Sequence, residues 1–155
     1  MIEVVRKQLD AARAAGGGIV MVLPAAGSGT FRALVDDLDM RYVNLSLELA
    51  RRLLDVPIPA RSGRVFQELS SLLGSSPTQV ALGHLGLLHH PALQLDAVRA
   101  IEQLARGRVV LAEWDGDYDG WALTYAEPGH QEYRRWDNPR MPVVDLRGHR
   151  ERITP

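Results

Sequence analysis

The chain has 155 residues, a formal net charge of −1 and no cysteine, and 17 of its 18 lysine and arginine residues are arginine. This length suits one compact domain, so we expect a single domain over residues 1–155. The lack of cysteine excludes a disulfide scaffold, a thiolate zinc site and a cysteine nucleophile. The near-neutral charge argues against a surface that coats nucleic acid or membrane, and a mechanism that needs a lysine has only Lys7 to supply it.

Targeting signals are not apparent in the sequence. The first residues lack the apolar core of a signal peptide, and no apolar run approaches the length of a bilayer span. We therefore expect a cytoplasmic protein that does not enter a membrane.

Helices and short strands alternate along the chain, as judged from apolar residues at helical spacing and from short β-branched runs. In the first half we expect a helix over residues 1–15, a strand over Ile19–Leu23, a helix from Phe31, a strand over Arg41–Leu45, and a helix over Ser46–Leu54. In the second half we expect a helix from Val65 to Leu73, a strand over Thr78–Leu82, a helix from Leu95 to Leu104, and strands over Val109–Ala112 and Trp121–Tyr125.

Three local features refine these elements. Ser46 is the expected N-cap of its helix, with Leu47, Ala50 and Leu54 along one apolar face. The turn residues of Asp115–Gly120 predict a hairpin between the last two strands. Beyond them lies a polar extension over about residues 137–155, in which Met141–Leu146 can pair at a sheet edge.

This alternation predicts an α/β fold with three layers, in which a mostly parallel sheet lies between helices and carries a C-terminal hairpin. In such sheets the ligand crevice lies beyond the carboxyl ends of the strands. That location directs attention to Pro24–Thr30, Gly83–His90 and Trp114–Gly120.

The glycine-containing loop after the first strand has the setting of a phosphate-binding loop, because backbone amides and a helix N-terminus can surround an anion there. The P-loop pattern is G-x-x-x-x-G-K-[ST]. With Gly29 on its second glycine, Pro24 stands on the first, Thr30 on the lysine and Phe31 on the hydroxyl position. A tight strand-to-helix connection and phosphate binding through backbone amides both stay open. The candidate phosphate-binding residues are Gly27, Ser28, Gly29 and Thr30.

The third strand lacks the acidic residue that holds magnesium in P-loop enzymes, since no carboxylate occurs between Glu68 and Asp96. The histidines His84, His89 and His90 have no neighbouring acid in the sequence, so we interpret them as packing or exposed residues.

Asp115, Asp117 and Asp119 match the first ligand positions of an EF-hand loop, but Ala126 replaces the bidentate glutamate and the flanking segments are strands. Turn chemistry is therefore the favoured interpretation, and a weak Ca²⁺ or Mg²⁺ site is the alternative. A serine nucleophile is excluded because the G-x-S-x-G elbow is absent.

Two groups of arginines are candidates for contacts with other molecules. Arg134, Arg135 and Trp136 combine basic and aromatic character, which suits nucleic acid or a protein partner. Arg106 and Arg108 flank a helix end, where an arginine can reach into a neighbouring subunit, although a helix C-terminus also attracts cations by itself.

Several of these stretches resemble one family in a consistent order. They are Tyr42–Leu49 (YVNLSLEL), Arg51–Leu54 (RRLL), Trp114–Gly116 (WDG) and Leu123–Tyr133 (LTYAEPGHQEY). Together they are similar to the BrxF family, the small P-loop-containing proteins of BREX (bacteriophage exclusion) defence systems, from the first strand to about Trp136.

The resemblance implies a P-loop NTPase-like fold and a role beside other phage-defence proteins. Typical members carry a loop similar to G-P-P-G-S-G-K-T and an acidic third strand. Here only Gly27, Ser28 and Gly29 of that loop remain, and Gly83 and Gly86 stand where acidic residues are expected.

We therefore expect a non-catalytic P-loop-like subunit that acts through protein assembly, with binding of ATP and Mg²⁺ and homo-oligomer formation left open. The alternatives are an NTPase completed by a partner subunit, and a nucleic-acid-binding accessory subunit.

Overall fold

A parallel sheet with helices on both faces forms most of the chain in the computed structural model, which describes residues 2–74, 79–148 and 153–154. The helices are α1 (Ile2–Ala14), α2 (Thr30–Asp37), α3 (Leu45–Leu53), α4 (Arg61–Leu73) and α5 (Ala97–Leu104), with 3₁₀ turns η1 (Ile58–Ala60), η2 (Gly86–His89) and η3 (Pro91–Leu93). The strands are β1 (Gly18–Leu23), β2 (Tyr42–Asn44), β3 (Gln79–Gly83), β4 (Val109–Glu113), β5 (Asp117–Tyr118), β6 (Ala122–Tyr125), β7 (Arg134–Asp137), β8 (Val143–Asp145) and β9 (Ile153–Thr154).

The main sheet has the strand order β2-β3-β4-β1-β8-β9. All of its neighbouring strands are parallel except β8 and β9, which pair antiparallel. The α/β architecture with a mostly parallel sheet is thus confirmed. Residue Thr78, with which the predicted third strand begins, lies outside the described residues.

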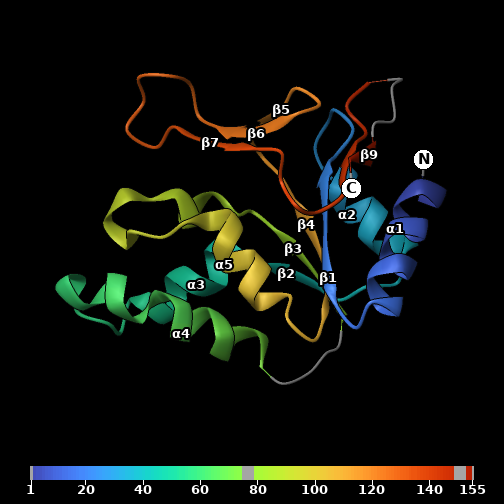
Figure 1. Ribbon diagram of the computed structural model, residues 1–155. Helices are drawn as coiled ribbons and strands as arrows, with labels where there is room; N and C mark the ends of the chain where they lie inside the picture. Colours follow the sequence, from blue (N-terminus) through green and yellow to red (C-terminus); the bar gives the residue numbers. More distant parts are fainter. Residues whose placement is uncertain (1, 75–78, 149–152, 155) are drawn as a thin grey trace.

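Helices cover the two faces of this sheet in two groups (Figure 1). On one face, Val20 and Val22 of β1 pack in a cluster with residues of α1 and α2. On the other face, Ile19, Met21 and Leu23 pack in a larger cluster with residues of α3, α4 and α5. The continuous apolar run of β1 is therefore explained by burial on both faces of a central strand.

A small antiparallel sheet of order β5-β6-β7 lies beyond the end of the main sheet, above α5 in the view of Figure 1. The predicted hairpin between the fourth strand and Trp121–Tyr125 is wrong. Both edges of β4 are already paired, with β1 and β3, so a hairpin partner has no free backbone groups there. Trp114 instead fixes the small sheet, because its indole N–H donates to the carbonyl oxygens of Asp117 (3.2 Å) and Thr124 (3.1 Å).

Other sequence predictions need local correction. Asn44, not Ser46, is the N-cap of α3, because the Asn44 side chain accepts a hydrogen bond from the Leu47 amide. The Ser46 hydroxyl donates to the His84 carbonyl and so ties α3 to the end of β3. The C-terminal segment supplies β8, which pairs parallel with the central strand β1.

The apolar face predicted for α3 is not the one that packs in the core. Helix α3 buries Leu45, Leu49 and Leu53, whereas Leu47 and Leu54 are 46% and 76% exposed. No helix of the described residues is long and apolar enough to cross a membrane.

Candidate functional site

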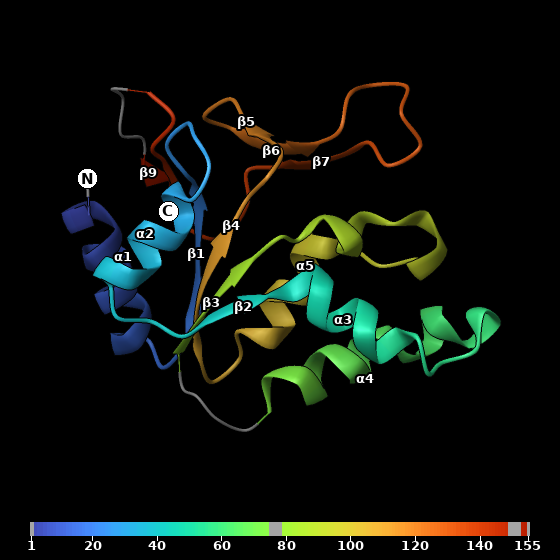
Figure 2. The same cartoon turned by 180° about the vertical axis from the view of Figure 1, so that it is seen from behind.

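The carboxyl ends of β1, β3 and β4 meet at one edge of the main sheet, since these strands are parallel neighbours. The loop over residues 24–29 leaves β1 there, and Trp114 follows β4 with its amide bonded to the Val22 carbonyl at 2.8 Å. Figure 2 shows this edge beneath the small sheet, with the loop between β1 and α2 beside it. The structure thus brings together the three segments that the sequence singled out.

The loop between β1 and α2 is held together by a hydrogen bond from one of its own side chains. Gly27 and Gly29 have positive φ angles of 109° and 78°, a conformation that favours glycine. The Thr30 hydroxyl, at the position of the P-loop lysine, donates to the Ala25 carbonyl at 2.6 Å and lies 3.3 Å from the Gly27 carbonyl. Ser28 is exposed. The loop therefore presents backbone amides but no cationic side chain of its own.

A tyrosine fills the space where an acidic residue of the third strand would stand. A Cβ atom added at Gly83 would lie 2.7 Å from the Tyr42 hydroxyl oxygen and 2.8 Å from its Cε2 atom. Arg32, one turn into α2, places its guanidinium 4.1 Å from the centre of the Tyr42 ring. Burial and the nearby Glu113 carboxylate raise the Tyr42 pKa, so its hydroxyl stays protonated and neutral. The end of β3 is thus occupied by an uncharged phenol.

Carboxylates gather around the same edge. A Cβ atom at Gly86 would lie 3.4 Å from the Tyr125 hydroxyl oxygen and 3.6 Å from the Asp115 Oδ2 atom, which places these two side chains together over η2. Protein packed around Asp115, together with the negative charge of Glu113, raises the Asp115 pKa. Two neighbouring carboxylates disfavour a phosphate at this point.

The remaining acidic residues of the predicted turn have separate structural roles. Asp117 accepts from Arg147 at 2.6 Å, and Arg147 also donates to Asp145 at 2.9 Å and to the Tyr118 carbonyl at 3.1 Å. This ion-pair cluster ties β5 to β8 and lowers the Asp117 pKa. Asp119 accepts from the amides of Trp121 and Ala122, both at 2.8 Å, as an Asx turn does.

The structure therefore does not bring Asp115, Asp117 and Asp119 to one point. Within the described residues, no three or more His, Asp or Glu side chains are arranged to hold a metal ion. The predicted turn chemistry explains Asp119, whereas Asp117 serves as an ion-pair partner.

An aromatic cluster beside this edge was not anticipated from the sequence. The His89 ring stacks on Tyr125 with 3.6 Å between ring centres and 7° between planes, and contacts Trp114 and Trp136 edge-on. Burial, reinforced by Arg134, lowers the His89 pKa to about 4, so the imidazole is neutral at pH 7. Its Nε2 atom is buried and has no hydrogen-bond partner among the residues that the structure describes. His84 and His90 are both exposed.

Side chains of the basic and aromatic stretch in β7 form hydrogen bonds within the protein. The Trp136 indole N–H donates to Asp96 at 3.1 Å, and Asp96 also caps α5. The Arg135 guanidinium donates to Asp137 at 2.6 Å. Trp136 is partly buried and packs against the core.

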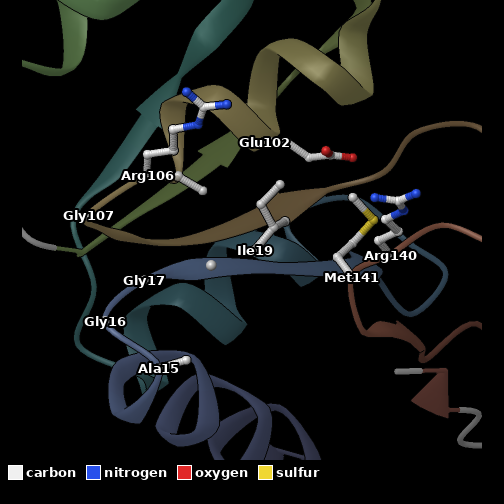
Figure 3. Close-up of a pocket in the computed structure, with 11 residues that line it drawn as sticks. Ala15, Gly16, Gly17, Ile19, Glu102, Arg106, Gly107, Arg140 and Met141 are labelled. Carbon is white, nitrogen blue, oxygen red and sulfur yellow. The ribbon is translucent and has the colours of Figure 1, made fainter.

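Arg106 and Arg108, at the end of α5, differ in whether the guanidinium is free to contact another molecule. Arg108 donates to the Gly74 carbonyl at 2.7 Å, which holds it against the protein. Arg106 is exposed on the rim of a hollow of about 440 Å³ and forms no ion pair within the described part of the chain. Figure 3 shows Ile19 and Met141 between Arg106 and Arg140 in this hollow. The hollow lies at the amino ends of β1 and β4, opposite the edge that carries the loop.

Comparison with protein-family models, with curated proteins and with solved structures finds no match for this chain. The resemblance to the BrxF family therefore rests on the quoted residues, and it stays a prediction.

Proposed function

We propose that the chain is a P-loop-like subunit that does not hydrolyse nucleotide and that acts in the cytoplasm by assembling with the proteins of a BREX-type phage-defence system. The observation that carries this proposal is that uncharged groups occupy the two places where a P-loop ATPase has its lysine and its acidic residue. Thr30 turns its hydroxyl onto loop carbonyls, and the Tyr42 ring covers Gly83. A P-loop ATPase needs a lysine and an acidic residue at these two places to stabilise the transferred phosphoryl group and its Mg²⁺ ion.

The electrostatics of the edge support the same proposal. The Arg147 guanidinium is held by Asp117 and Asp145, and Arg32 lies over the Tyr42 ring. Within the part of the chain that the structure describes, neither of these arginines forms an ion pair with Glu113 or Asp115. ATP bound with Mg²⁺ still carries net negative charge, so its affinity for this edge is low.

The defence role follows from the resemblance. The most specific part of that resemblance, Trp114–Gly116 with Leu123–Tyr133, contributes Trp114 and Tyr125 to the aromatic cluster around His89. These residues hold the small sheet on the main sheet. We infer that this segment shapes a surface for other proteins.

Calorimetric titration with ATP and Mg²⁺ tests the proposal, first with the purified chain and then with its co-expressed defence partners. We expect neither the heat of turnover nor micromolar binding for the isolated chain. Micromolar binding with turnover that coelutes with the chain in gel filtration would contradict the proposal. The coelution distinguishes turnover by the chain from turnover by a contaminating ATPase.

A second candidate function is an NTPase completed by a partner, and the free guanidinium of Arg106 is the observation that favours it. Because Arg106 and the loop lie at opposite edges of the sheet, a head-to-tail arrangement of subunits would bring them together. Turnover by the assembled complex that Arg106→Gln abolishes and Arg140→Gln leaves unchanged would support this candidate. Absence of turnover in the assembled complex would exclude it.

A further inference from the structure

Helix α3 has two apolar faces, and only one of them packs in the core. Leu45, Leu49 and Leu53 are buried, whereas Leu47 and Leu54 are exposed on another face. Leu47, Ala50 and Leu54 follow one another at spacings of three and four residues, so they form one stripe along the helix. Ile58 of η1 is 73% exposed and lies beside the end of this stripe. Helix α3 lies on the side of the molecule away from α1 (Figure 1).

The stripe borders a groove of about 300 Å³, which we call the α3 groove. Its lining residues come from α3, from the turn into α4 and from the segment between β3 and α5, and they are Ala50, Leu53, Leu54, Ile58, Arg61, Leu87, His90, Ala92 and Leu93. Most of this lining is apolar. An exposed apolar surface of this kind in an otherwise polar exterior marks an interaction site.

The groove also carries the positive charge of Arg61. Arg61 donates its Nε–H to the Val56 carbonyl at 3.0 Å, and it forms no ion pair in the described residues. His90 accepts a hydrogen bond from the Ala92 amide on Nδ1 at 3.1 Å. None of the lining residues is acidic. The groove therefore complements apolar side chains that are accompanied by a carboxylate.

The charge of the groove also disfavours a symmetric contact with a second copy of the chain. A two-fold contact through the α3 groove would bring the groove of each copy onto the same groove of the other. Each copy would then bring its Arg61 into the same apolar interface, and the lining of the groove offers no carboxylate to pair with either guanidinium.

We propose that the α3 groove binds an amphipathic helix of a partner protein that places leucine-like side chains along the stripe and a carboxylate against Arg61. The stripe from Leu47 to Leu54 spans about 10 Å, which corresponds to about two turns of such a helix. This inference deepens the proposed function and rests on it, because it names the kind of partner that an assembly subunit would engage.

Fluorescence anisotropy with designed peptides tests the groove directly. The probe is a labelled helical peptide of about 14 residues with leucines at positions i, i+3 and i+7 and one glutamate beside them. Two matched peptides replace that glutamate by glutamine or lysine. Each is titrated with the wild-type chain, with Leu54→Ser, with Ile58→Ser, and with the control Trp121→Ser, which alters an exposed aromatic residue on the other sheet.

We expect the glutamate peptide to bind, and we expect each groove variant to weaken binding about tenfold or more, the loss that follows from one unburied large aliphatic side chain. The control variant leaves the affinity unchanged. The glutamine peptide binds more weakly than the glutamate peptide, and the lysine peptide binds more weakly still.

Three results overturn the inference: no binding of the glutamate peptide, equal binding of the glutamate and lysine peptides, or a doubled mass in light scattering that Leu54→Ser restores to one chain. Phosphate release from ATP is measured on the same samples. Turnover contradicts the proposed function and leaves the peptide result standing, whereas a chain that neither turns over ATP nor binds the peptide overturns the groove inference alone.

Discussion

Replacing Gly83 by alanine tests whether Tyr42 closes the carboxyl end of β3. The φ angle of Gly83 is not positive, so alanine suits this backbone and by itself would stabilise the strand by about 0.5–1 kcal/mol. The new Cβ atom, however, would lie 2.7 Å from the Tyr42 hydroxyl oxygen, well inside van der Waals contact. The Tyr42 ring, packed between Arg32 and Phe31, then has to move.

Forcing such a shift in a packed region costs about 1–3 kcal/mol. When the stabilisation of the strand backbone by alanine is subtracted from this cost, Gly83→Ala is expected to lower the free energy of unfolding by up to about 2 kcal/mol. In a Tyr42→Ala background the same substitution meets open space and becomes neutral or stabilising. The two substitutions are therefore coupled by about 1–3 kcal/mol.

Urea unfolding of the four proteins of this double-mutant cycle gives the coupling energy. Gly63→Ala serves as the matched control, because a Cβ atom at Gly63 in α4 meets nothing within 4 Å. If Gly83→Ala stabilises the wild-type chain, or changes stability equally in both backgrounds, Tyr42 does not fill the position of the acidic residue.

Further predictions concern the loop, the aromatic cluster and the ion pairs. Thr30→Val removes the hydrogen bond to the Ala25 carbonyl and is expected to lower the free energy of unfolding in urea by about 1 kcal/mol, with no gain of ATP hydrolysis. An unchanged urea midpoint would contradict the role of this hydrogen bond in holding the loop. The His89 pKa is about 4 in the folded chain and near 6.5 in the unfolded chain, so the unfolded state binds more protons between these pH values. The free energy of unfolding therefore falls by about 3 kcal/mol in total as the pH is lowered from about 6.5 to 4. His89→Phe keeps the stacking on Tyr125 and should remove this part of the pH dependence. Identical profiles of stability against pH for the wild-type and His89→Phe proteins would refute the assignment to His89. Arg147→Gln releases Asp117 and Asp145 and is expected to cost about 1–2 kcal/mol, with an upward shift of the Asp117 pKa in NMR titration that Arg140→Gln does not produce.

The sheet could be predicted from the sequence because its signals are local. The β-branched run that became β1 lies between glycines and Pro24, and each helix has apolar residues at helical spacing. Parallel pairing follows once strands and helices alternate. The position of the loop at the carboxyl edge follows from the same rule.

The sequence predictions fail where the structure depends on pairing between distant strands, or on which of two apolar helix faces meets the sheet. Turn residues at Asp115–Gly120 fit a hairpin, but β4 is already paired on both edges, which only the complete strand order reveals. Leu47 and Leu54 look like a core face because the sequence offers two apolar stripes on α3 and does not say which one meets the sheet.

The sequence was enough to predict that the three loop segments lie at one edge of the sheet, but not which side chains occupy that edge. The replacement of the motif lysine by Thr30 is visible in the sequence, whereas the filling of Gly83 by Tyr42 requires the approach of two strands. The stacking of His89 on Tyr125 joins residues 36 positions apart, and neither residue signals the other in the sequence.

Steady-state phosphate release from ATP and Mg²⁺ by the purified chain, alone and assembled with its defence partners, tests the central claim most directly. The account predicts release at the rate of the protein-free blank for the chain alone, and a rate for the assembly that Thr30→Val leaves unchanged. Sustained release that coelutes with the chain and is lost in Thr30→Val would contradict it, because the loop would then take part in phosphoryl transfer.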